Sequence, residues 1–270
     1  MPIVFSIRLH LPIGAIVSLS SLPKFENTIM TTMIKHIIAI ALFTIAIMVE
    51  AAEPSFSRSK ELLQEAVYYD HLITFYANCN YVVERVEGKQ KPVLKPQWDS
   101  CGFTPRKQAT RASRIEWEHV MPAHRFGSHM PCWQTGGRRN CTDVPAFDER
   151  EADMHNLVPA IGEINGDRSN FRFAIIPGEA RVYGDVDFEV DFKNRVAEPA
   201  PIQRGDIARI YFYMAERYNV ELTPGEQKMF EEWNKADPVS EWEKTKNRRV
   251  YAIQGNYNRF IEVLDQNNSR

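Results

Sequence analysis

A carboxylate stands beside an imidazole at Glu118 and His119, in the stretch R-I-E-W-E-H, and Asn156 follows within D-M-H-N-L. Carboxylate and amide oxygens are ligands that Mg²⁺ accepts while it keeps several waters. A neutral imidazole can take a proton from water near pH 7. These side chains are candidates for phosphodiester hydrolysis with one metal ion, with Glu118 and Asn156 as metal ligands and His119 as general base.

The elements that carry these residues must meet a geometric condition. Apolar and charged residues alternate from Ile115 to Glu118, which predicts a strand that ends near Pro122. Successive side chains of a regular strand point to opposite faces. We therefore expect the strand to break at Glu118–His119, so that Glu118 faces the metal and His119 faces the attacking water.

Basic residues stand where a nucleic acid would need them, although a solvated surface charge is the commoner role for any one of them. Arg138 follows two glycines, which allow close approach to a ligand, so we expect it to stabilise the scissile phosphate, with Arg139 as its competitor. The chain has a formal net charge of −2, so a nucleic-acid site must be locally basic. The candidates for phosphate contacts are Arg106, Lys107, Arg111, Arg114, Arg139, Arg168 and Arg172.

The N-terminal region has the layout of a secretory signal peptide. Lys35 and His36 precede an apolar run at 37–49, and Ala51 offers a small residue for cleavage. The run is shorter than the roughly 20 residues of a spanning helix, although a membrane anchor or a buried helix is the alternative. We divide the chain into 1–51, an upstream extension plus a cleaved signal peptide, and 52–270, one domain. The expected location is periplasmic or secreted, with no stable membrane association after cleavage.

Export bears on the cysteines, because oxidising compartments favour disulfides. Three pairings are possible, and the pairing of nearest neighbours closes the shortest loops. A zinc site is the alternative, but no C-x-x-C pair is present. The cysteines are Cys79, Cys101, Cys132 and Cys141.

Periodicity predicts helices at both ends of the domain and short strands between them. Capping boxes begin at Thr223 and Ser240, and Gly255 ends the last helix. The predicted elements are a helix over 59–76, a strand at 81–86, a loop at 87–104, an irregular loop at 124–148, a helix over 151–165, a strand at 188–192 and a helix over 207–218.

Several long stretches carry a resemblance to a known family. They are RASRIEWEHVMPAHRFG at 111–127, CWQTGGRRNC at 132–141, EADMHNLVPAIGEINGDRSNF at 151–171 and EPAPIQRGDIARIYFYMAERYN at 198–219. With them the chain resembles the bacterial endonuclease I family of periplasmic or secreted non-specific nucleases. That family carries the ββα-metal (His-Me finger) active site, and the resemblance spans nearly all of 52–270.

The resemblance implies an α+β fold: a mostly helical single domain with a small antiparallel sheet and a ββα-metal motif. It implies that His119 is the general base, that Glu118 and Asn156 hold Mg²⁺, for which Mn²⁺ could substitute, and that Arg138 stabilises the phosphate. The implied activity is cleavage of DNA and RNA to 5′-phosphate ends through contacts to the phosphate backbone, by a monomer with disulfides.

Two other functions remain open from the sequence. One is a catalytically silent protein that binds or takes up nucleic acid, and it would bind without cutting. The other is a secreted zinc hydrolase built on histidines, although the H-E-x-x-H motif is absent. Its candidate ligands are His119, His124, His129 and His155.

Overall fold

The computed structural model describes residues 55–178 and 180–261, so the expected signal peptide lies outside the described residues. The first described helix, α2 (Phe56–Leu62), is capped by the side chain of Ser55 and continues as one π-helical turn, η2 (Leu63–Val67). The prediction that this helix reaches residue 76 is wrong. The chain turns back after η2, and the N–H of Thr74 donates to the carbonyl of Cys79 (2.8 Å).

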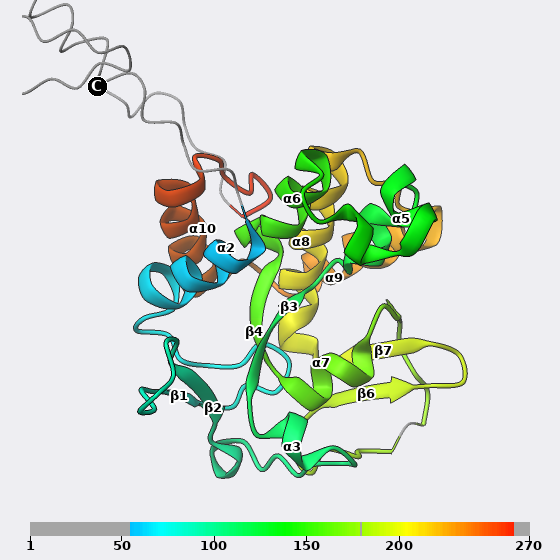
Figure 1. The fold of residues 1–270 in the computed structure, drawn as a ribbon. Helices are drawn as coiled ribbons and strands as arrows, with labels where there is room; N and C mark the ends of the chain where they lie inside the picture. Colours follow the sequence, from blue (N-terminus) through cyan, green and yellow to red (C-terminus); the bar gives the residue numbers. More distant parts are fainter. Residues whose placement is uncertain (1–54, 179, 262–270) are drawn as a thin grey trace, which may run out of the picture. The chain divides into compact units, whose positions relative to one another are not determined.

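The other elements follow in chain order (Figure 1). They are β1 (Tyr81–Glu84), β2 (Val93–Pro96), η3 (Trp98–Ser100), α3 (Ala109–Ala112), β3 (Ile115–His119), α4 (Ala123–Gly127), α5 (Pro131–Gly136), η4 (Arg138–Cys141), α6 (Pro145–Ala152), η5 (Met154–Asn156), β4 (Leu157–Ile161), α7 (Gly162–Arg168), β5 (Arg172–Phe173), β6 (Phe188–Asp191), β7 (Val196–Pro199), α8 (Pro201–Tyr218), α9 (Pro224–Ala236) and α10 (Glu241–Gln254).

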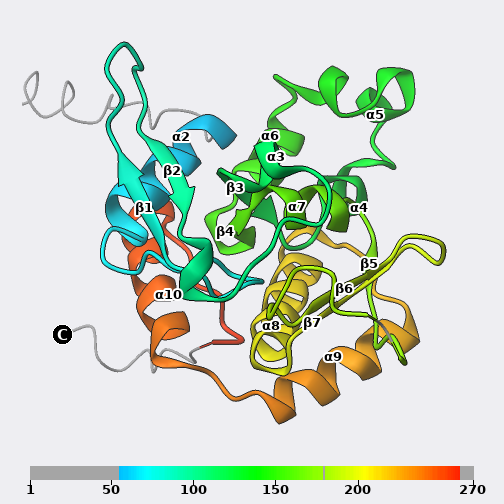
Figure 2. The same ribbon diagram turned by 90° about the horizontal axis from the view of Figure 1, so that it is seen from below.

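The strands form small sheets among these helices. β1 pairs with β2 and β3 pairs with β4, each antiparallel, while β7 lies between β5, which is parallel to it, and β6, which is antiparallel. Figure 2 shows β6 and β7 beside α8. The predicted α+β fold, mostly helical with small sheets, is confirmed. The strands predicted at 81–86, 115–119 and 188–192 are present as β1, β3 and β6.

The helix predicted over 151–165 is wrong. The segment holds the end of α6, the 3₁₀ turn η5, the strand β4 and the start of α7. All five residues of β4 are buried, and a short run buried on both faces lacks the alternation that marks a half-buried strand. The loop predicted at 124–148 instead contains short helices, and the loop predicted at 87–104 contains β2 and η3.

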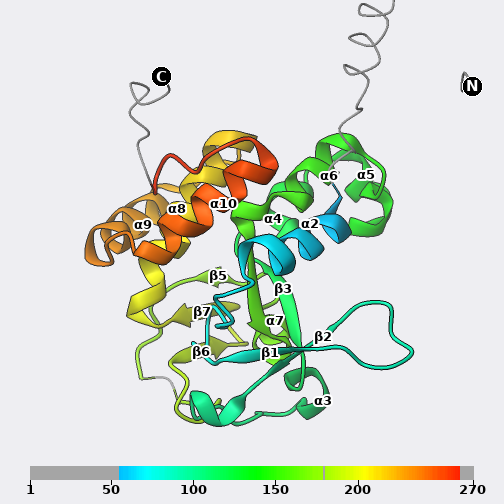
Figure 3. The same ribbon diagram turned by 90° about the vertical axis from the view of Figure 1, so that its left-hand side faces the viewer.

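Two apolar clusters fix the β3–β4 hairpin. The larger packs β3, β4 and α8 through residues such as Val158, Ile161 and Met214. The smaller joins η2, β4 and α10 through Leu63, Leu157, Val250 and neighbouring side chains. Figure 3 shows α2 beside α6, with which it is in contact. The hairpin is therefore held between α2 on one face and α7 on the other.

The predicted capping boxes and the predicted helix end at Gly255 are confirmed. Both capping boxes are present, at Thr223 and Ser240, and Gly255 ends α10 with a positive φ of 83°. Disulfides join Cys79 to Cys101 and Cys132 to Cys141. Among the described residues, none of the helices has the length and apolar character needed to cross a membrane.

Candidate active site

A strand–strand–helix unit carries the candidate site. In the β3–β4 hairpin His119 lies opposite Leu157, and the N–H of Val120 extends the ladder to the carbonyl oxygen of Asn156 (3.0 Å). The helix α7 follows β4 directly and contacts both strands (Figure 1). Gly162 and Gly166 let α3 approach α7, because a Cβ at Gly162 would meet the carbonyl oxygen of Arg111 and one at Gly166 would meet its guanidinium. The unit thus has the order of a ββα motif.

The expected break at Glu118–His119 is wrong. Pairing with β4 is regular throughout β3, so the two side chains point to opposite faces. Glu118 lies on the α7 face, where it meets Arg168, and His119 lies on the α2 face, where it meets Phe56. The strand stays regular because β4 offers a partner to each of its residues, and Pro122 interrupts the chain only after His119.

The imidazole of His119 is held by one hydrogen bond and two aromatic contacts. Its Nε2 lies 2.8 Å from the carbonyl oxygen of Glu151. A carbonyl can only accept, so Nε2 carries the proton and Nδ1 keeps its lone pair. The ring packs against Phe56 and Phe126 at centroid distances of 4.8 and 5.9 Å. His119 is therefore fixed in the tautomer that a general base requires.

Burial also sets the charge of this imidazole. Burial lowers the pKa of His119 to about 3, and the positive charge of Arg138 makes the second-largest contribution to this shift. The ring is therefore neutral near pH 7, and the same burial makes it a weaker proton acceptor than an exposed imidazole.

Glu118 is held from the opposite face of β3. Its Oε1 accepts from Nη1 of Arg168 (2.8 Å) and from the hydroxyl of Tyr76 (3.1 Å). Burial raises the pKa of Glu118 to about 7, although Arg168 and Tyr76 oppose that shift. Within the described chain Oε2 has no hydrogen-bond partner, so one carboxylate oxygen remains for a metal ion.

Asn156, the expected amide ligand, is anchored to the backbone of Met121. It is completely buried, its Oδ1 accepts from the N–H of Met121 (2.7 Å) and its Nδ2 donates to the carbonyl of Met121 (2.9 Å). These two hydrogen bonds to the backbone of Met121 join the chain after β3 to the chain before β4. These bonds position the Asn156 side chain. An amide oxygen has two lone pairs, so Oδ1 can still accept a second partner, and the role of Asn156 as a metal ligand stays a prediction.

Asn165 on α7 is a candidate that the sequence reasoning missed. Its Nδ2 donates to Glu116 (2.9 Å), and its Oδ1 has no partner among the described residues. Arg168, one turn further along α7, contacts Glu118, so the same side of the helix faces both carboxylates. The available signal was the spacing of Asn165 and Arg168 in a helix that directly follows a buried strand.

The loop after α5 brings Arg138, rather than Arg139, to His119. Nε of Arg138 donates to the carboxylate of Glu151 (2.6 Å), the residue whose carbonyl binds the imidazole. The guanidinium also lies 5.6 Å from the centre of the Phe56 ring. Cys132–Cys141 closes the loop that holds both arginines. Arg139 is exposed, and no hydrogen bond or ion pair joins it to these residues.

The other predicted basic residues fall into three groups. Arg168 is fully buried and bound to Glu118 and to backbone carbonyls, so its predicted role in contacting nucleic acid is wrong. Three arginines are paired with carboxylates: Arg106 with Asp167, and Arg111 and Arg114 with Glu116. Lys107, Arg139 and Arg172 are exposed, and the described chain offers no ionic partner to their side chains.

The donor set fits a hard metal ion held by few protein groups. Glu118 offers one carboxylate oxygen. Asn165, which is bonded to Glu116, two residues before Glu118 on the same face of β3, offers an amide oxygen. A small number of protein ligands of this kind suits an Mg²⁺ that keeps most of its waters. Over residues 55–178 and 180–261, no cluster of three or more His, Cys, Asp or Glu could hold a metal. The four cysteines form disulfides and so are not zinc ligands.

Comparison with known proteins identifies the family of this chain. Residues 57–264 match the family described as Endonuclease I. An extracellular deoxyribonuclease of Aeromonas hydrophila is 47% identical over 210 residues, covering 77% of this chain and 88% of that protein. A periplasmic deoxyribonuclease of the same species is 49% identical over 197 residues, covering 73% and 81%. Endonuclease-1 of Buchnera aphidicola is 42% identical over 217 residues, covering 80% and 86%. The chain therefore belongs to the endonuclease I family.

Proposed function

We propose that the protein is an exported, Mg²⁺-dependent endonuclease that cuts phosphodiester bonds of DNA, and of RNA, with little sequence preference. The observation that carries this proposal is the bond from His119 to the carbonyl of Glu151, which leaves Nδ1 as a neutral base. The deoxyribonuclease activity of the relatives supports the substrate, and their extracellular or periplasmic location supports export.

The chain's own residues divide the work of hydrolysis. Nδ1 of His119 accepts a proton from the water that attacks phosphorus. Arg138 uses only Nε to bind Glu151, so its two terminal nitrogens can donate to a phosphate oxygen.

Glu118, with Asn156 or Asn165 as a second oxygen ligand, would hold the metal ion. Because Glu118 and His119 lie on opposite faces of β3, the metal and the base can meet one phosphate only at the end of this strand, where His119 is its last residue. When bound, Mg²⁺ supplies charge neutralisation at the phosphate and at the leaving oxygen.

Arg168 couples the two faces of β3. Its Nη1 donates to the carboxylate of Glu118 (2.8 Å) and to the carbonyl of His119 (2.9 Å), while Nη2 reaches the carbonyl of Val120. One guanidinium therefore sets the position of the metal-binding carboxylate relative to the backbone of the general base. We assign Arg168 as a positioning residue.

Substrate contacts would come from exposed cations. Lys107, Arg139 and Arg172 can donate to backbone phosphates, which carry no sequence information. Binding of this kind predicts tolerance of sequence and a steep dependence on salt. We expect one polypeptide to suffice, because all proposed catalytic groups come from a single chain.

Digestion of a supercoiled plasmid tests the proposal. The purified mature protein should nick and then degrade the plasmid with Mg²⁺ or Mn²⁺, stop with EDTA, and leave 5′-phosphate ends that a DNA ligase can rejoin. His119→Ala should lose cutting by roughly a hundredfold or more while keeping its circular dichroism spectrum. A His119→Ala protein that cuts like the wild type would refute the mechanism, and undiminished cutting in EDTA would refute the metal requirement.

A further inference from the structure

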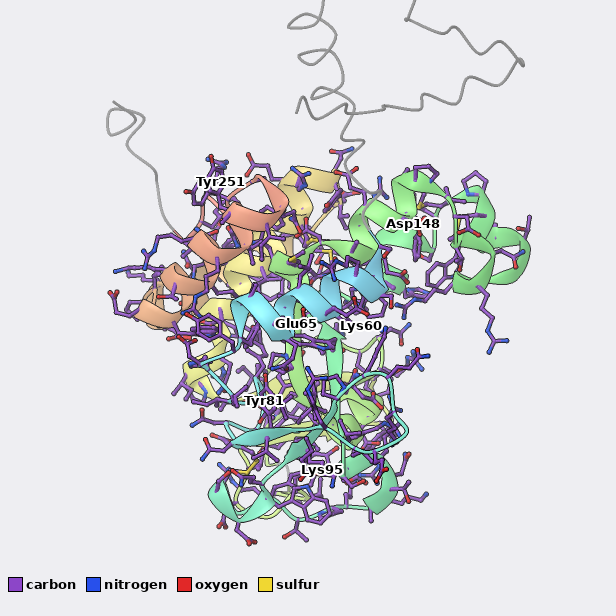
Figure 4. The ribbon with its side chains drawn as sticks, turned by 60° about the vertical axis from the view of Figure 1, so that its left-hand side comes forward. Lys60, Glu65, Tyr81, Lys95, Asp148 and Tyr251 are labelled. Atoms are coloured by element: carbon purple, nitrogen blue, oxygen red, sulfur yellow. A yellow bond between two sulfur atoms is a disulfide. The ribbon has the colours of Figure 1, made fainter. Side chains whose placement is uncertain are left out.

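The first helix of the domain lies directly beside the general base. Phe56 opens α2, and its ring is 4.8 Å from the ring of His119. Lys60 follows one turn later and projects from α2 (Figure 4), with Nζ 4.3 Å from the centre of the Phe56 ring. Arg138 approaches the same ring at 5.6 Å. Two cations from distant parts of the chain therefore meet at one aromatic ring next to His119.

The two cations differ in how they are neutralised. Arg138 is paired with Glu151, whereas Lys60 makes no ion pair or hydrogen bond within the described chain beyond its contact with Phe56. The nearest acid on its own helix, Glu61, is already bonded to Arg58 (3.2 Å) and Lys91 (2.8 Å). The three N–H donors of the Lys60 ammonium therefore remain available.

The surroundings of this ammonium favour an anion. Burial lowers the pKa of Lys60, and the nearby positive charges of Lys91 and Arg138 lower it further. The negative charge of Glu151 opposes this shift. A cation that is partly desolvated among other cations gains more from an added anion than a freely solvated lysine does. The site adjoins His119, where the proposed function places a phosphodiester.

We propose that Lys60 is a second phosphate-binding residue of the active site, which binds a backbone phosphate of the strand being cut. Phe56 positions the Lys60 ammonium, because its ring contacts both this ammonium and the imidazole of His119. This inference rests on the proposed nuclease function. A lysine suits the role because its ammonium is a compact charge that accepts many phosphate orientations, in line with a lack of sequence preference.

Binding to a short DNA duplex tests the inference in a His119→Ala background, which should bind without cutting. Addition of Lys60→Ala should weaken binding about tenfold and reduce the slope of log K against log salt by about one. Lys60→Arg should retain the slope, because it keeps the charge. Arg58→Ala is the matched control, since residue 58 lies two positions along the same helix and faces a different side.

In the active enzyme, Lys60→Ala should raise KM for plasmid DNA with a smaller effect on kcat. An unchanged salt slope in Lys60→Ala would overturn the inference. Equal losses in Lys60→Ala and Lys60→Arg would also overturn it, because they would indicate a packing role. A wild-type protein that does not cut DNA would instead refute the proposed function, so the two failures can be told apart.

Discussion

The guanidinium of Arg168 lies 2.8 Å from the carboxylate of Glu118, and both side chains are almost completely buried. A buried ion pair stabilises a fold only when each partner has further hydrogen bonds. Arg168 has them at the carbonyls of His119 and Val120, and Glu118 has one from Tyr76. The pair therefore fixes the geometry of the hairpin end rather than simply adding stability.

Arg168→Gln should destabilise the fold, because it leaves Glu118 without its cation and two carbonyls without donors. We expect a loss of about 3 kcal/mol in the free energy of unfolding, measured by urea denaturation. Arg172→Gln is the comparison, since that arginine is exposed, and its effect on stability should stay within about 0.5 kcal/mol. Equal stability of the two variants would show that the buried bonds of Arg168 do not stabilise the fold.

The two asparagines should separate folding from metal binding. Asn165→Ala should fold normally but need at least about ten times more Mg²⁺ for half-maximal activity, because it removes a proposed ligand. Asn156→Ala should cost about 2–3 kcal/mol of stability, because the N–H and carbonyl of Met121 lose their buried partners. Measurements of unfolding and of activity against Mg²⁺ concentration check both. A stable, inactive Asn156→Ala beside an active Asn165→Ala would identify Asn156, rather than Asn165, as the ligand.

The pH dependence of the nuclease activity should follow the titration of Glu118 rather than that of His119. With the pKa of His119 lowered to about 3, its neutral form dominates from pH 5 upward. Glu118, with its pKa raised to about 7, holds a proton below that pH, and a metal ion must displace it. Activity at low Mg²⁺ should therefore fall as the pH drops through about 7, and added Mg²⁺ should move this fall to lower pH. If activity instead falls near pH 6.5 at every Mg²⁺ concentration, a histidine with an unshifted pKa would be the group that controls it.

The same shifts bear on stability. Between pH 3 and 6.5 the unfolded chain protonates His119 more readily than the folded protein does, so this group makes stability fall as the pH is lowered. His119→Ala should lose less stability than the wild type between pH 7 and pH 5, measured as the change in urea midpoint. An identical loss in both proteins would show that the imidazole titrates normally.

Local spacing was enough to predict several elements. Alternation marked β3, and the Thr223 and Ser240 capping boxes marked the starts of two helices, because these patterns depend on neighbours within a few residues. The sequence left three disulfide pairings open. The structure has the pairing of nearest neighbours. Cys132–Cys141 encloses Arg138, so this pairing bears directly on the site.

Tertiary contacts decided what the sequence could not. Leu157–Ile161 reads equally well as helix or strand, and its pairing with β3 makes it a strand. Arg168 resembles any surface arginine until α7 places it against Glu118. Asn156 and Asn165 are the same residue type, and only their contacts separate them: Asn156 is bonded to the backbone of Met121, whereas Asn165 is bonded to Glu116.

The Cys132–Cys141 disulfide should matter more for catalysis than Cys79–Cys101. In the chain-entropy model, loss of either bond costs about 3 kcal/mol of stability. Replacement of both Cys132 and Cys141 by serine should in addition lower kcat, because it frees the loop that aims Arg138 at His119.

The activity of the two double variants should be compared at a temperature where both remain folded. Arg138→Ala should cause a large further loss in the Cys79/Cys101 variant and a small one in the Cys132/Cys141 variant, because residues that act together give non-additive losses. Equal further losses in the two variants would mean that the disulfide does not position Arg138. In that case the bond of Arg138 to Glu151 would be sufficient to hold the arginine beside the general base.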